Sequence, residues 1–123
     1  MGIWMQGLAF FVACGLGGLS RWGIQHLVWS LAPLQWRGFG TLTANILACF
    51  LAGLLVSLPW VQSNHRLFLV SGFCGGFSTF SAFALDHLTL AKGQLLAAFG
   101  LLALHVLLGL ASAALGLWLG RQV

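Results

Sequence analysis

Four long apolar stretches separated by short polar ones make up almost the whole chain, and within each stretch the apolar residues run continuously. A run of about 20 apolar residues can cross a bilayer as an α-helix, whereas a β-barrel strand alternates in polarity over about ten residues. The pattern therefore predicts an all-α membrane protein. Its single transmembrane domain (residues 1–123) has helices at about residues 3–31, 39–58, 67–91 and 95–119.

Composition supports this prediction and excludes several functions. Of the 123 residues, 60% are hydrophobic and 5% charged, whereas about a quarter of a soluble domain is charged. The five basic residues are scattered, so we expect no nucleic-acid binding. Asp86 is the single carboxylate and no Cys/His spacing matches a metal motif, so we expect no enzyme. We expect the protein in the cytoplasmic (inner) membrane of a prokaryote.

A few polar residues interrupt the apolar stretches. Thr41, Asn45, Cys49 and Gly53 recur at steps of four, which places them on one face of the second helix and predicts an interhelical seam. An amide in hydrocarbon needs partners, so Asn45 serves either helix packing or a polar pathway. Arg21 lies deep in the first stretch, where it faces a partner or a wet vestibule, or extends to the membrane surface.

His105 is a further polar residue, in the fourth stretch. An intramembrane histidine is functional chiefly when it has ionisable partners, and none is evident in that stretch. We therefore expect His105 to be a hydrogen-bonded packing residue rather than a proton carrier.

The third stretch contains residues that a membrane helix normally avoids, in the order Gly72-Phe-Cys-Gly-Gly-Phe-Ser-Thr-Phe-Ser-Ala-Phe83. Glycine costs about 1 kcal/mol relative to alanine in a helix, and hydroxyl side chains offer the backbone competing hydrogen bonds. The stretch predicts a mid-membrane break, from Gly75 to Ser78, and such a break is tolerated where the freed backbone groups are buried in protein or line a wet cavity. Close helix packing by small residues is the alternative.

The basic residues also bear on orientation. With both termini on one side, Arg66 and Arg121 lie on that side, and Arg37 and Lys92 lie on the other. Two against two gives no positive-inside bias, so the chain could insert both ways. An antiparallel, dual-topology homodimer would satisfy this ambiguity.

Three segments resemble the successive signatures of the CrcB/Fluc family of small fluoride channels. They are Gly15-Leu-Gly-Gly-Leu-Ser-Arg21, Gly40-Thr-Leu-Thr-Ala-Asn45 and the third-stretch segment that ends at Phe83. The resemblance covers essentially the whole chain in order, length and span count. It implies an antiparallel homodimer with two fluoride pores and a central structural sodium ion (Na⁺).

By matching positions, the resemblance assigns roles to individual residues. Backbone carbonyls of Gly75 and Ser78 would hold the sodium ion, and Arg21 matches the first-helix arginine of the family. The implied pore and fluoride-binding residues are Asn45, Phe80, Ser81 and Phe83. These assignments make chemical sense, because the amide and the hydroxyl are hydrogen-bond donors and the edge of a phenyl ring is positive.

The chain departs from the family pattern at two positions. The family commonly has threonine where this chain has Ser78 and Ala82, so one hydroxyl is lost at Ala82.

Two other functions are alternatives to a fluoride channel. A small dual-topology multidrug exporter also has four spans, but it needs a membrane-embedded carboxylate, typically in the first helix, where this chain has none. A non-transporting membrane assembly subunit would use the glycines for packing alone.

Overall fold

The computed structural model describes residues 2–31 and 38–123, and every regular element in these two ranges is helical. The elements are α1 (Ile3–Leu31), α2 (Gly38–Ser57), α3 (Ser63–Arg66), η2 (Leu67–Cys74), α4 (Gly75–Phe77), α5 (Phe80–Ala91) and α6 (Leu95–Gly120). Elements α3 to α5 form the third of four apolar spans, which have 29, 20, 29 and 26 residues and are long enough to cross a membrane. The predicted all-α fold with a broken third span is confirmed, although that span begins at Ser63 rather than at about residue 67.

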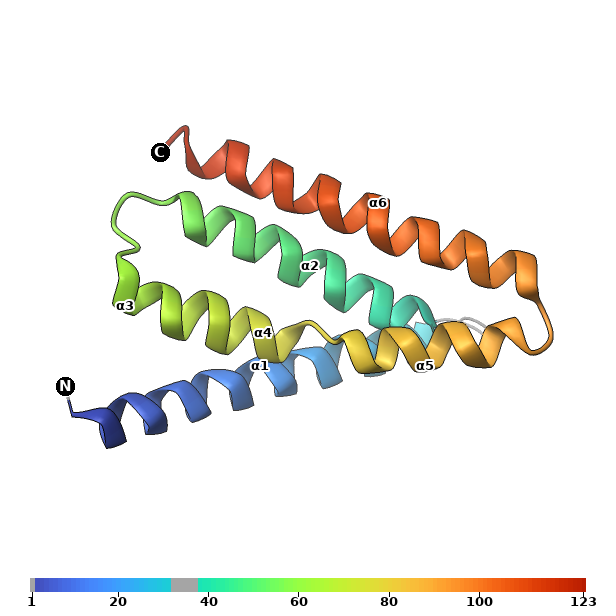
Figure 1. Ribbon diagram of the computed structural model, residues 1–123, viewed down its shortest axis with the longest axis horizontal. Helices are drawn as coiled ribbons and strands as arrows, with labels where there is room; N and C mark the ends of the chain where they lie inside the picture. The colour runs from blue at the N-terminus through green and yellow to red at the C-terminus, as the bar shows by residue number, and fades with distance from the viewer. Residues whose placement is uncertain (1, 32–37) are drawn as a thin grey trace.

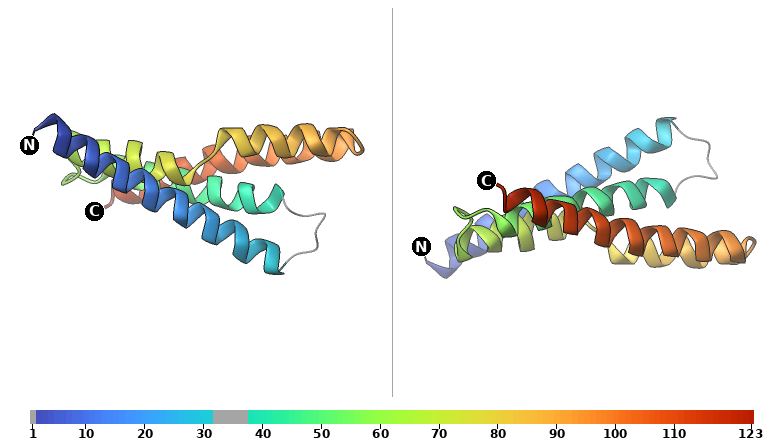
Figure 2. Two further views of the ribbon diagram at one scale, coloured as in Figure 1. Left: turned by 90° about the horizontal axis from the view of Figure 1, so that it is seen from below. Right: turned by 90° about the horizontal axis from the view of Figure 1, so that it is seen from above.

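Helix α2 lies in the middle of the bundle, between α6 and the third span (Figure 1). The third span changes its partner helix at the break, because η2 and α4 pack on α1 whereas α5 packs on α6. Figure 2 shows the consequence: α5 runs with α6, and α1 diverges from them beyond the break. The break therefore lies where the third span crosses from one side of the bundle to the other.

The predicted seam on α2 is confirmed, and it contacts three different spans. Thr41 Oγ1 accepts a hydrogen bond from Gln25 Nε2 of α1 at 3.3 Å, and Asn45 bonds the third span. Gly53 lies against the backbone of Ala113 in α6, so closely that a Cβ atom would overlap it. Small and polar residues thus let α2 approach all of its neighbours.

Close packing also explains most glycines of the third span. A Cβ atom on Gly76 would overlap the Cys14 backbone of α1, and one on Gly72 would lie 2.9 Å from the Ala13 Cβ atom. From the α1 side, Gly17 approaches the Phe73 carbonyl in the same way. Van der Waals contact between backbones is a main source of helix association in lipid, so these glycines hold η2 and α4 on α1.

The break does not include the glycines: the prediction placed it from Gly75 to Ser78, but of these residues only Ser78 lies outside the helix. Gly75 has helical φ and ψ of −63° and −39°, and no described glycine has a positive φ. The chain leaves the helix only at Ser78 and Thr79, with φ, ψ of −76°, 159° and −151°, 116°. These are ordinary extended angles, so hydroxyl residues make the turn and the glycines make the packing.

The helix before the break is itself irregular. Residues Leu67–Cys74 are wound as a π-helix, and the Gly75 N–H reaches back five residues to the Val70 carbonyl. π-helical turns are rare and occur frequently at functional sites. The third span therefore departs from α-helical winding in the turns that lead into the break.

The two termini lie at the same end of the bundle, with the α2–α3 connection, and the α5–α6 turn lies at the other end (Figure 1). Arg66 and Arg121 are therefore at one end and Lys92 at the other, as the sequence predicted. Arg37, the fourth residue in that count, lies outside the described residues. Large side chains such as Trp4 (89% exposed) and Leu96 (86% exposed) cover the outside of the bundle, which suits a lipid environment.

Candidate ion pathway at the broken third span

Asn45 of α2 holds the break in place by forming two hydrogen bonds with one backbone unit. Its Oδ1 atom accepts from the Thr79 N–H at 2.7 Å, and its Nδ2 atom donates to the Thr79 carbonyl at 3.2 Å. The side-chain amide therefore pairs with the extended backbone of Thr79 as the backbone of a neighbouring β-strand would. One of the two Nδ2 hydrogens is not needed for this pair and remains available as a donor.

Thr79 is a residue of the candidate site that sequence reasoning missed. It is buried (9% exposed) and caps α5, because its Oγ1 atom accepts from the Ala82 N–H at 3.3 Å. The same Oγ1 atom lies 3.2 Å from Ser81 Oγ, so the two hydroxyls share a hydrogen bond. Threonine is a preferred N-cap, and its position directly before an apolar helical run is the signal that could have identified it.

Thr79 also connects two residues that the sequence assigned to the pore separately. Asn45 binds the Thr79 backbone and Ser81 binds the Thr79 side chain, so a continuous polar path runs from α2 to the start of α5. Buried backbone at membrane depth requires such partners, and the path supplies them.

Arg21 of α1 reaches the break from the opposite side. Its Nη1 atom donates to the Ser78 carbonyl at 3.1 Å. The sequence left open whether Arg21 faces a partner, a vestibule or the membrane surface, and the structure places its guanidinium on the break. A positive charge therefore lies at the carbonyl that the family resemblance gave to a sodium ion.

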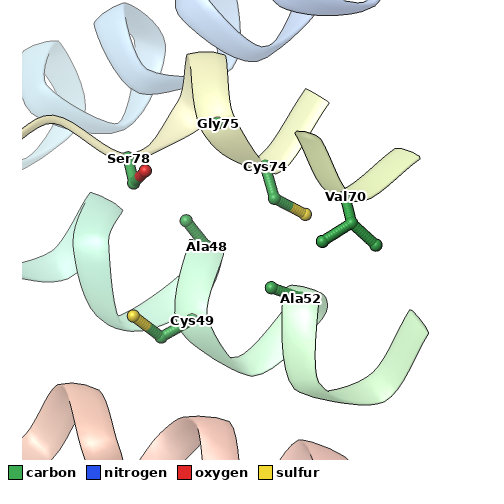
Figure 3. A pocket seen from close by; sticks show the side chains of 7 residues that line it. All are labelled: Ala48, Cys49, Ala52, Val70, Cys74, Gly75 and Ser78. Carbon is green, nitrogen blue, oxygen red and sulfur yellow. The ribbon is translucent and has the colours of Figure 1, made fainter. Parts of the chain in front are cut away.

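The Gly75 carbonyl is released by the same arrangement. In a continuous α-helix the Thr79 N–H would donate to Gly75, four residues before it, but here that N–H donates to Asn45. Gly75 and Ser78 both line a groove of about 210 Å³ between the third span and α2. Figure 3 shows the Cys74 and Val70 side chains directed from the third span toward α2 across this groove.

A metal ion would have to rely on these backbone oxygens. In residues 2–31 and 38–123, no group of three His, Cys, Asp or Glu side chains could hold one. Carbonyl oxygens are hard ligands that suit a hard cation, which binds several oxygens at once. Two carbonyls from one chain are too few, so a complete site would need further oxygens from a second copy.

The phenylalanines beyond the break form a row along α5. The rings of Phe80 and Phe83 have centroids 5.2 Å apart, and Phe80 is 79% exposed while Phe83 is half-buried. Ser81, between them in the sequence, is also exposed. An aromatic ring that is this exposed in the single chain requires lipid or protein to cover it.

Comparison with known proteins shows the family. Residues 8–117 match the family model described as CrcB-like protein, Camphor Resistance (CrcB). The chain belongs to the CrcB family. Relatives in this family include a fluoride-specific ion channel FluC from Paracoccus denitrificans, 42% identical over 111 residues, which covers 86% of each chain. Those from Psychrobacter arcticus (40% identical, 94% of this chain and 92% of the relative) and Haemophilus influenzae strain PittGG (38%, 94% and 93%) carry the same name.

Membership in the CrcB family agrees with the four spans and makes the chain a multi-pass protein of the cell membrane. The three sequence signatures lie inside the matched range, and each contributes a residue to the break: Arg21, Asn45 and Ser78. Segments far apart in the sequence therefore meet at one place in the structure.

Proposed function

We propose that the protein is a fluoride channel that lets fluoride leave the cell passively and so lowers its intracellular toxicity. Membership in the CrcB family and the names of its relatives support this function. The observation that carries the proposal is the broken third span, at which Arg21, Asn45 and the Thr79 hydroxyl surround irregular backbone at membrane depth. Such backbone is tolerated where it lines a pathway or is buried in protein.

In this proposal the pore wall consists of Phe80 and Phe83 on one side and of Asn45 and Ser81 near the break. Fluoride is small and strongly hydrated, so a pore must replace its water with donors. The free Asn45 amide hydrogen and the Ser81 hydroxyl are such donors, and the phenyl ring edges carry partial positive charge. Several weak contacts of this kind let an ion enter and also leave.

The functional unit in this proposal is a homodimer in lipid. Its copies are antiparallel and contribute to two pores. The groove between the third span and α2 exposes Gly75 and Ser78 on one face of the chain, where a second copy would cover them. The weak charge bias between the two ends supports insertion in both orientations.

We also propose that carbonyls of Gly75 and Ser78 from both copies hold a central sodium ion with a structural role. Carbonyl oxygens suit a hard cation, and the Gly75 carbonyl, which does not accept the Thr79 N–H, belongs to a residue that lines the groove. Arg21 already donates to the Ser78 carbonyl, so that oxygen would have to accept the guanidinium with one lone pair and face the cation with the other.

Passive flux separates this proposal from the exporter and the assembly subunit, neither of which conducts fluoride passively. Purified protein is reconstituted in liposomes loaded with fluoride or chloride, and efflux is followed with ion-selective electrodes after an ionophore dissipates the membrane potential. The proposal expects fast fluoride efflux and no comparable chloride efflux. Absence of fluoride efflux, or equal efflux of both anions, would contradict it.

A further inference from the structure

Two histidines extend the aromatic row beyond Phe83. His87 of α5 lies with its ring centroid 4.3 Å from that of Phe83, and His105 of α6 lies 4.8 Å from it. The two imidazoles are 5.1 Å apart at an interplanar angle of 69°. No ionisable partner for His105 is evident from the sequence of its own span, but the packing of α5 on α6 brings His87 against it from the neighbouring span.

The hydrogen bonds of the two rings determine which nitrogen carries the hydrogen. His105 Nδ1 lies 3.1 Å from the Leu101 carbonyl, and His87 Nδ1 contacts the Phe83 carbonyl. A carbonyl can only accept, so both Nδ1 atoms are the donors. In the neutral rings, each Nε2 atom is then an acceptor with a lone pair.

Both Nε2 atoms are buried and have no hydrogen-bond partner, and the same holds for Asp86 Oδ2 next to His87. Three buried acceptors without a donor are costly, because burial removes the water that would otherwise donate to them. A bound proton would turn one acceptor into a donor, and Asp86, the single carboxylate of the chain, would favour that positive charge.

Few other titratable groups surround the pair among residues 2–31 and 38–123. Helix α5 contributes Asp86 and His87, and α6 contributes His105. On α2, which packs on both, Cys49 lies near Gly109, one helical turn beyond His105. Lys92 caps the far end of α5 and is exposed, and Arg21 of α1 is held at Ser78. Within the described part of the chain, a proton in this region therefore has the two imidazoles and Asp86 as its nearest sites.

We propose that His87 and His105 form a proton-dependent anion site at the end of the phenylalanine row. The neutral pair presents lone pairs, which repel an anion, whereas the protonated pair presents an N–H donor, which attracts fluoride. This inference rests on the proposed fluoride channel function. It adds that fluoride conduction rises as the pH falls, because the site then supplies a donor beyond Phe83.

The test is fluoride efflux from liposomes at about pH 5.5 and about pH 7.5, on either side of the ordinary imidazole pKa of about 6.5. Protein-free liposomes correct for permeation as neutral hydrogen fluoride. The wild-type protein should conduct fluoride several-fold faster at the lower pH, where a bound proton supplies the N–H donor. The H87Q/H105Q variant should lose the pH dependence, because its amides donate at both pH values.

The chain contains a matched control in its other two histidines, His26 on α1 and His65 on α3. His26 stacks on Trp22 and His65 is exposed, so the H26Q/H65Q variant should keep the wild-type pH dependence. If H87Q/H105Q does not form a stable protein, the single variant H87Q, at the less buried position, should still reduce the pH dependence.

The outcomes separate the two claims. Absence of fluoride efflux by the wild type at both pH values would overturn the channel function itself. Fluoride efflux that is equal at both pH values, or that keeps its pH dependence in H87Q/H105Q or in a folded H87Q variant, would overturn only the histidine site.

Discussion

At the scale of single residues, Asn45 is the side chain on which the break depends most. It satisfies both hydrogen-bonding groups of Thr79, a buried residue whose backbone belongs to no helix. A backbone group left without a partner in hydrocarbon costs as much as a lost hydrogen bond or more. Asn45 therefore stabilises the fold as well as contributing to the proposed pathway.

Replacement of Asn45 by alanine should lower both stability and fluoride flux. Two backbone groups lose their partner, at about 1–3 kcal/mol each, so the thermal unfolding midpoint in detergent should fall clearly. Thr43→Ala is the matched control. Among the described residues, Thr43 Oγ1 donates only to the Phe39 carbonyl of its own helix. Equal unfolding midpoints for Asn45→Ala and Thr43→Ala would contradict this role of Asn45.

At the scale of elements, the glycines and the hydroxyl residues of the third span have different structural roles. The glycines bring η2 and α4 onto α1, and Ser78 and Thr79 turn the chain so that α5 continues along α6. The broken span thus joins the two sides of the bundle. Its position in the fold follows from which helix each half packs against.

Adjacent glycines of α1 test the packing contribution. A methyl group at Gly17 would overlap the Phe73 carbonyl and the Phe77 amide of the third span, whereas one at Gly18 has nothing within 4 Å. Gly17→Ala should destabilise the protein by about 1–3 kcal/mol through overpacking. Gly18→Ala should be neutral or slightly stabilising because alanine favours helix. Thermal unfolding of the two variants in one detergent is the measurement, and a larger loss for Gly18→Ala would refute the packing account.

Much of this element could be predicted from the sequence, and the part that could not has a physical reason. Helix-breaking composition predicted that the third span breaks, and the steps of four on α2 predicted its seam. The break was placed three residues too early because a glycine in an apolar helix costs little when it gains close packing, and composition does not show what lies opposite it. Thr79 and the pairing of His87 with His105 depend on which helix faces meet, which the periodicity of one span does not determine.

At the scale of the whole molecule, the charges leave the orientation open. Arg66 and Arg121 lie at one end of the bundle and Lys92 lies at the other, so neither end is strongly marked as cytoplasmic. An antiparallel dimer requires both orientations in equal numbers. The proposed dimer therefore makes a prediction about topology that does not depend on conduction.

Labelling of a single introduced cysteine tests the topology. The three native cysteines, Cys14, Cys49 and Cys74, are first replaced by alanine, so that only the introduced cysteine can react. A cysteine introduced as Val123→Cys lies at the exposed C-terminus. An impermeant maleimide should label about half of these cysteines in intact cells, and the rest only after the membrane is opened. Labelling of all or none in intact cells would rule out dual topology.

Fluoride efflux through two phenylalanine variants tests the central claim, that the row beyond the break is the pore wall. Phe80 and Phe11 are similarly exposed in the single chain, at 79% and 73%, but only Phe80 belongs to the row. Phe80→Ile removes a ring edge that would face the ion, so fluoride efflux should fall roughly tenfold or more, equivalent to about 1.4 kcal/mol of barrier. Phe11→Ile should conduct like the wild type. Equal efflux through Phe80→Ile and the wild type, with the protein folded, would contradict the account.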